Sequence, residues 1–229
     1  MAGGRGHTGS DDLGEFALIA ALFKPLAAAM PAALGLGDDA AVLTPRPGRD
    51  LVLTKDAMVE GVHFLGTDDP AHVAQKLLRV NLSDLAAMGA APVGYLLATF
   101  WPENITRPWI EGFAAGLKAD QATFGIGLLG GDTVRTPGPL SLSLTAIGEV
   151  ENGKALRRSG AEAGDLIAVS GTIGDAALGL MILRGDKLPD LSPAARQHLA
   201  ARYHLPRPRL ALGQQLAGPG RSVGEWLPV

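Results

Sequence analysis

The sequence of 229 residues contains no cysteine, which excludes disulfide bonds, thiolate metal sites and a cysteine nucleophile. It has no run of lysine or arginine and a formal net charge of -3, so a surface for nucleic acid or anionic membranes is not expected. No apolar run reaches the roughly 18 residues of a membrane-spanning helix. The first residues, MAGGRGHTGSDD, carry acids where a signal peptide needs an apolar core. We therefore expect a cytoplasmic protein that binds neither nucleic acid nor membranes.

The sequence is rich in apolar residues and in glycine. Hydrophobic residues make up 47% of the chain and charged residues 19%, which is enough to build a substantial core in one large domain or two smaller ones. Many of the 31 glycines stand at the ends of apolar runs. Glycine at such places lets the backbone approach a ligand closely, so the composition favours a binding site built from turns between strands and helices.

The hydrophobic pattern predicts helices and strands in alternation and divides the chain into three parts. Residues 1–12 are expected to be a flexible tail, 13–150 an N-terminal domain, and 151–229 a partial C-terminal domain, because the polar residues Asn152 to Lys154 indicate a boundary. Helices are expected around 13–23, 69–89 and 109–117 and from about 175, and strands at 51–54, 93–100, 140–150 and 165–171, with a further strand that ends at Gly131.

The helix between Asp69 and Gly89 places a carboxylate where a folded protein rarely tolerates one. Asp69 and Pro70 are typical of a helix start, and Gly89 of a helix end. At about 100° per residue, Asp84 falls on the apolar stripe of this helix. A buried carboxylate needs a cation or a proton, so Asp84 indicates a metal site, unless it only caps the amides of another loop. The other members of that stripe are Val73, Leu77, Val80 and Met88.

Other carboxylates follow apolar runs in the same way. Asp38 and Asp39 are neighbours on a glycine turn, where they repel each other unless a cation lies between them and another group, although such a pair is also an ordinary polar turn. Asp132 and Thr133 follow two glycines. The strand that starts at Leu51 is expected to deliver three polar residues together at its end, which are Thr54, Lys55 and Asp56.

Two further features are weighed against ordinary explanations. His63 stands between apolar residues, where a histidine is more often a core residue than a ligand. Arg157 and Arg158 form a pair that solvent usually surrounds, but arginine is also well suited to hold phosphate oxygens. The G-x-x-x-x-G-K pattern from Gly148 to Lys154 is not a phosphate-binding loop, because Ala155 follows and no helix is expected there.

The remaining candidates form a set of oxygen ligands without a histidine or cysteine cluster. Carboxylate and hydroxyl oxygens favour magnesium, which usually keeps waters and binds through substrate phosphates. Several ions shared by several acids indicate a polyphosphate, so the chemistry expected from the residues is phosphoryl transfer without a P-loop. The set comprises Asp38 or Asp39, Thr54, Asp56, Asp84 and Asp132.

Several motifs taken together closely resemble thiamine-monophosphate kinase, a family of the superfamily that includes aminoimidazole ribonucleotide synthetase and selenophosphate synthetase. The resemblance runs in order from about residue 14 to about residue 217. The motifs are Gly14-Glu15-Phe16, Gly37-Asp38-Asp39, Asp56 with His63-Phe64, Asn81 to Gly89 (NLSDLAAMG), Gly130-Gly131-Asp132-Thr133 and Arg158-Ser159-Gly160.

The resemblance implies an α+β fold with an N-terminal mixed sheet and helix domain of the aminoimidazole ribonucleotide synthetase-like type, which pairs into a homodimer. It implies ATP-dependent phosphorylation of thiamine monophosphate to thiamine diphosphate, with several Mg²⁺ ions. His63 would contact the thiamine substrate, and Gly131, Asp132 and Arg158 would contact ATP. The magnesium ligands implied by matching positions are Asp39, Thr54, Asp56, Asp84 and Asp132.

The sequence departs from the family pattern at two places. Lys55 stands where members often carry a hydroxyl residue that helps to hold a magnesium ion, so Lys55 and Asp38 are the weaker candidate ligands. After Gly213, members continue with Asp-x-Ser-Asp-Gly-Leu and later Gly-Gly-Glu-Asp, whereas this chain ends with AGPGRSVGEWLPV. We therefore expect an incomplete, truncated C-terminal α+β domain. The alternatives are a non-catalytic dimeric module that binds magnesium and nucleotide, and another ATP-dependent synthetase of the superfamily.

Overall fold

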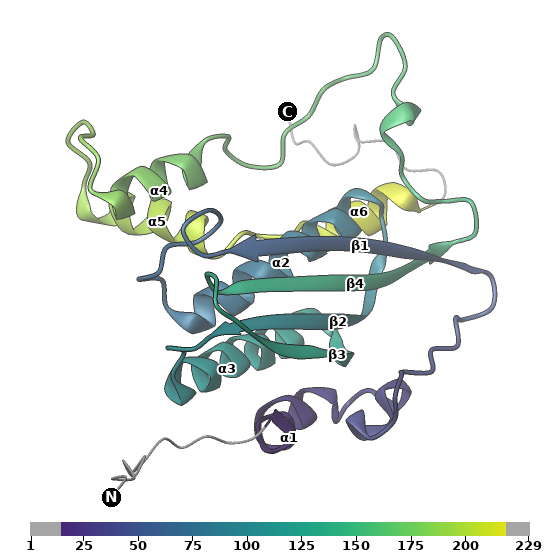
Figure 1. Ribbon diagram of the computed structural model, residues 1–229. Coiled ribbons are helices and arrows are strands. Elements are labelled where there is room, and N and C mark those ends of the chain that lie inside the picture. The colour runs from purple at the N-terminus through teal and green to yellow at the C-terminus, as the bar shows by residue number, and fades with distance from the viewer. Residues whose placement is uncertain (1–14, 219–229) are drawn as a thin grey trace, which may run out of the picture.

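The computed structural model describes residues 15–218, and the tail expected at 1–12 lies outside them. The fold is α+β, as expected, and is built around one mixed sheet of four strands in the order β1-β4-β2-β3 (Figure 1). β4 pairs antiparallel with β1 and β2, and β2 pairs parallel with β3. The strands are β1 (Arg49–Val59), β2 (Ala91–Pro102), β3 (Gly127–Thr136) and β4 (Ser141–Glu151).

Two long helices, α2 (Pro70–Ala87) and α3 (Arg107–Phe124), lie side by side on one face of the sheet (Figure 1). α2 begins as the sequence predicts, because the Asp69 side chain accepts hydrogen bonds from the first free backbone N–H groups. Gly89 follows its end with φ +72°, a conformation that glycine adopts without strain. The core lies between these helices and the inner face of the sheet, where Leu77, Phe113 and Leu144 are fully buried.

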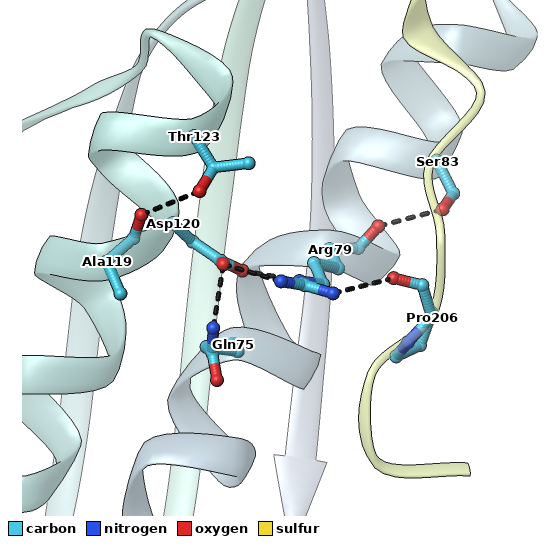
Figure 2. A network of polar contacts seen from close by, with 7 residues as sticks. All are labelled: Gln75, Arg79, Ser83, Ala119, Asp120, Thr123 and Pro206. Atoms are coloured by element: carbon cyan, nitrogen blue, oxygen red, sulfur yellow. Dashed lines mark hydrogen bonds and ion pairs between the residues drawn. The ribbon is translucent and has the colours of Figure 1, made fainter. Parts of the chain in front are cut away.

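A buried ion pair joins the two helices (Figure 2). Arg79 of α2 donates from Nε and Nη2 to the two carboxylate oxygens of Asp120 of α3, over 2.6 and 2.8 Å. Gln75 Nε2 donates to the same carboxylate over 2.8 Å, and Arg79 Nη1 reaches the carbonyl of Pro206, 3.5 Å away. Because Asp120 is fully buried, these donors compensate a charge that would otherwise be unfavourable in the core.

The segment before β1 lies along the β3 side of the sheet (Figure 1). The expected helix through Phe23 is present, but it continues past Pro25 in a tighter 3-10 turn, because proline is accepted at the start of a new helical turn. Gln121 Nε2 donates to the carbonyl of Leu26 and to the hydroxyl of Tyr95, which ties this segment to α3 and β2. Its elements are α1 (Glu15–Leu18), π-helical η1 (Ile19–Phe23), and 3-10 helices η2 (Lys24–Ala27) and η3 (Pro31–Leu36).

The part after β4 contains helices but no strand among residues 152–218. The strand expected at 165–171 is a wrong prediction, since this stretch is an irregular segment with Leu166 88% and Ile167 97% exposed. A strand requires a hydrogen-bonded neighbour, and none of the four described strands lies beside it. None of the helices in the described part is long and apolar enough to cross a membrane. The helices are η4 (Arg158–Gly160), α4 (Asp175–Arg184), α5 (Pro193–His204) and α6 (Leu210–Ala217).

Candidate functional site

Three of the expected ligands meet where α2 passes beneath β1. Thr54 and Asp56 follow buried Val52 on the inner face of β1, and Asp84 of α2 faces them. The Thr54 hydroxyl donates a hydrogen bond of 2.7 Å to Asp84 Oδ2. Burial, and then the negative charge of Asp84, raise the pKa of Asp56. Two carboxylates that oppose each other's ionisation are relieved by a cation between them, which is the electrostatic setting of a metal site.

The surroundings of these residues differ from the sequence-based expectation in two respects. β1 continues to Val59, so Thr54 and Asp56 lie in the middle of the strand and Lys55 points to the opposite face, where it is exposed. Asp84 lies on the side of α2 that was expected, but it is exposed rather than buried. The reason is that the facing positions of β1 are short polar side chains, which leave the end of the helix open to solvent instead of sealing it as leucines would.

A second group lines a cavity of about 520 Å³ at the β3 side of the sheet. Asp38 and Asp39 reach it from the loop after η3, and Gly131 and Asp132 reach it from β3. The rest of the wall is largely apolar and includes residues of the amino-terminal segment and of β2, among them Ile19, Phe23, Leu36, Leu43 and Leu96. A cavity with an apolar wall and carboxylates at its edge suits a ligand with a ring system and a charged, metal-binding end.

The strand register separates the two groups of acids within one chain. Asp56 of β1 is opposite Leu144 of β4, Leu144 is opposite Leu97 of β2, and Leu97 is opposite Gly131 of β3. β1 and β3 are therefore three strand spacings apart, about 14 Å at roughly 4.8 Å each. Asp132 neighbours Gly131 and therefore belongs to the other face of the sheet. The described residues contain no group of three or more histidine, aspartate or glutamate side chains placed to hold one metal ion.

The remaining candidates occupy the turn after β1 and the segment after β4. His63 is exposed, which rules out the core role that its apolar neighbours suggested. Its Nδ1 accepts a hydrogen bond of 3.0 Å from the backbone N–H of Val59, and His63 is close enough to Asp56 to oppose the rise in the pKa of that carboxyl. Arg158 is exposed in η4. Sequence reasoning did not single out Lys76, whose contact with the His63 turn depends on folding and leaves no local signal.

The middle of the chain matches the model of a known protein family. Residues 37–150 correspond to the family model called AIR synthase related protein, N-terminal domain. This range runs from the Asp38–Asp39 loop to the end of β4 and includes the whole sheet together with α2 and α3. The fold and the site thus define a protein of the AIR synthase-related class.

Within that class, the chain belongs to the thiamine-monophosphate kinase family. It is 52% identical over 198 residues to the thiamine-monophosphate kinase of Caulobacter vibrioides, covering 86% of this chain and 55% of that protein. The crystal structure of thiamine-monophosphate kinase from Stenotrophomonas maltophilia is similar with a TM-score of 0.71 at 46% identity, over 80% of this chain and 58% of that one. The structure of AaThiL complexed with AMPPCP and TMP is similar with a TM-score of 0.69 at 31% identity, over 91% and 64%. The chain therefore spans somewhat more than half the length of these relatives.

Proposed function

We propose that the protein catalyses the ATP-dependent phosphorylation of thiamine monophosphate to thiamine diphosphate by direct phosphoryl transfer. The observation that carries this proposal is the electrostatic pairing of Asp56 with Asp84, which also accepts a hydrogen bond from Thr54, in a chain of the thiamine-monophosphate kinase family. Phosphoryl transfer depends on placing the phosphate of thiamine monophosphate in line with the transferred phosphate of ATP and on neutralising the charge of both. Paired carboxylates that hold cations meet the second requirement. The proposal includes the expected cytoplasmic location.

The residues around Asp56 fit magnesium. Asp56, Asp84 and the Thr54 hydroxyl supply hard oxygen donors, and the raised pKa of Asp56 has its second cause in the charge of Asp84. Magnesium commonly binds to one or two carboxylates and completes its shell with waters and substrate phosphates, so two facing acids are sufficient. When bound there, the ion would neutralise charge on the transferred phosphate group. Asp39 and Asp132 would hold further magnesium at the cavity, where Asp38 is also available.

The cavity beside Asp132 is the proposed place for ATP. The apolar wall of the cavity would cover the adenine base. Gly131 has no side chain, so phosphates at the edge of the cavity would be able to approach its backbone closely. A Cβ at Gly131 would collide with the Leu97 carbonyl oxygen, so no larger residue fits there without moving β2. Arg158 would approach the phosphates from the segment after β4, as the family resemblance implies.

A homodimer is the second part of the proposal. In Figure 1 no described helix covers the outer face of the sheet at β1. Large apolar side chains of β1 and β2 are exposed on this face. A second copy that packs on this face would bury them, and Asp132 belongs to this same face. Asp56 lies on the inner, helix-covered face of β1, so its magnesium site would remain separate from this interface. The apolar residues are Leu51, Leu53 and Phe100.

The reaction is tested with the chain itself. Thiamine monophosphate and MgATP are incubated with the wild-type protein and with Asp56→Asn, and thiamine diphosphate is measured by mass spectrometry. We expect product with the wild type and at least a hundredfold less with the variant. Binding of MgATP in calorimetry without product would contradict the kinase function and would support the alternative, a magnesium and nucleotide-binding module.

A further inference from the structure

A cluster of titratable side chains holds α5 against the first half of α2. His204 Nε2 lies 3.1 Å from Asp68 Oδ1, and the His204 ring stacks on that of His72 with centroids 5.0 Å apart. Beside them, the Lys76 ammonium lies over the Tyr203 ring, 3.5 Å from its centroid. The charge of Asp68 helps to raise the pKa of Tyr203 to about 12, after the larger effect of burial. The kinase reaction as proposed uses none of these five residues.

Lys76 connects this cluster to the turn that carries His63. Its Nζ donates a hydrogen bond of 2.8 Å to the main-chain oxygen of His63. The ammonium is thus held between a ring face and a carbonyl dipole, both of which attract a cation. The ammonium is partly withdrawn from water, and this burial lowers the pKa of Lys76 to about 8. Holding a lysine side chain in one rotamer costs conformational entropy, and a fully exposed lysine would not stay in one position. Packing against α5 therefore keeps Lys76 in place.

The turn itself fixes the histidine ring. The Val59 N–H donates to Nδ1, so Nδ1 carries no proton and a neutral His63 has its proton on Nε2. The backbone of the turn is closed by Gly61 N–H donating to the Phe64 carbonyl, with Gly61 at φ +78°. Three contacts therefore hold His63: its N–H donates to the Val59 carbonyl, the Val59 N–H donates to its ring, and Lys76 donates to its carbonyl.

We propose that Lys76, kept in place by the Tyr203 ring, is a positioning residue that holds the Gly61–Phe64 turn so that His63 presents an Nε2–H donor to an acceptor atom of the substrate. This inference rests on the proposed contact between His63 and thiamine monophosphate. It links α5, far along the chain, to the substrate side of the site through two side chains. Loss of the ammonium frees the His63 carbonyl and leaves the turn with its backbone hydrogen bonds alone, so the contact between Val59 N–H and Nδ1 loosens and the ring samples both tautomers.

The test combines ring ¹⁵N NMR at pH 7.5 with calorimetry of thiamine monophosphate binding, in the wild type, Lys76→Met, Lys76→Arg and the exposed-lysine control Lys118→Met. The His63 signals are assigned with His63→Gln. We expect one tautomer, protonated at Nε2, in the wild type, Lys76→Arg and Lys118→Met, and mixed tautomers with at least tenfold weaker binding in Lys76→Met.

Tyr203→Leu provides an independent measurement, because it removes the ring and leaves Lys76; it is expected to behave as Lys76→Met does. The inference is overturned if His63 keeps a single Nε2–H tautomer in both Lys76→Met and Tyr203→Leu, with unfolding that remains cooperative. If the tautomers respond as expected but the wild type does not bind thiamine monophosphate, the substrate proposal fails while the positioning role of Lys76 stands.

Discussion

At the scale of single residues, the site depends on two carboxylates that oppose each other's charge. Asp84→Asn removes one of these charges and keeps the shape, so it lowers the pKa of Asp56 toward its ordinary value. We expect a folded protein, as stable as the wild type or more stable without metal, whose ATP affinity no longer increases with magnesium. Calorimetry with and without magnesium measures this coupling. Asp186→Asn, at an exposed aspartate, is the control, and unchanged coupling in Asp84→Asn would contradict the assignment.

Lys76 gives a second prediction at this scale, for the pH dependence of stability. Its pKa is about 8 in the folded protein and 10.5 for a lysine fully surrounded by water, so between these values the unfolded chain binds more protons than the folded one. The free energy of unfolding contributed by Lys76 therefore rises with pH across this window. We expect the stability of the wild type relative to Lys76→Met to increase from pH 7.5 to pH 9.5 in urea unfolding. Wild type and Lys118→Met should show no such change in their difference.

At the scale of elements, the pair of Arg79 and Asp120 determines how α2 and α3 pack. Asp120→Ala leaves the Arg79 guanidinium, 15% exposed, without its main partner. Removing one partner of a buried pair costs about 3–5 kcal/mol, and we expect a loss of that order in urea unfolding. The double variant Arg79→Met with Asp120→Leu removes both charges and should recover most of the loss. A single variant with wild-type stability would show that the pair contributes little.

The same scale shows what local sequence can and cannot predict. α2 follows from Asp69, Pro70 and Gly89, whose effects on a helix end are local, and β4 follows from its alternation of polar and apolar residues. The expected strand at 165–171 has an equally good local pattern, but it finds no partner strand. Whether a strand forms depends on pairing with distant residues, which a pattern within one segment does not contain.

At the scale of the whole molecule, the sequence marks individual acids as candidate ligands, but it does not predict how they are grouped. Asp56 and Asp84 meet because α2 crosses under β1, whereas Asp132 is three strands away on the other face. That separation depends on the strand order β1-β4-β2-β3. Spacing along the chain gives no information about this order, so the division of the acids into two groups emerges only from the fold.

The proposed homodimer gives a test at this scale. Leu53 is 63% exposed on the outer face of β1, at the proposed interface. Leu53→Asp places a charge there, which must be desolvated on association, so we expect sedimentation velocity to show a dimer for the wild type and a monomer with unchanged circular dichroism for the variant. Leu166→Asp, at an exposed leucine outside the sheet, is the matched control and should remain dimeric. If Leu166→Asp is monomeric and Leu53→Asp is dimeric, the chain associates through the segment after β4, and the outer face of the sheet is not the interface.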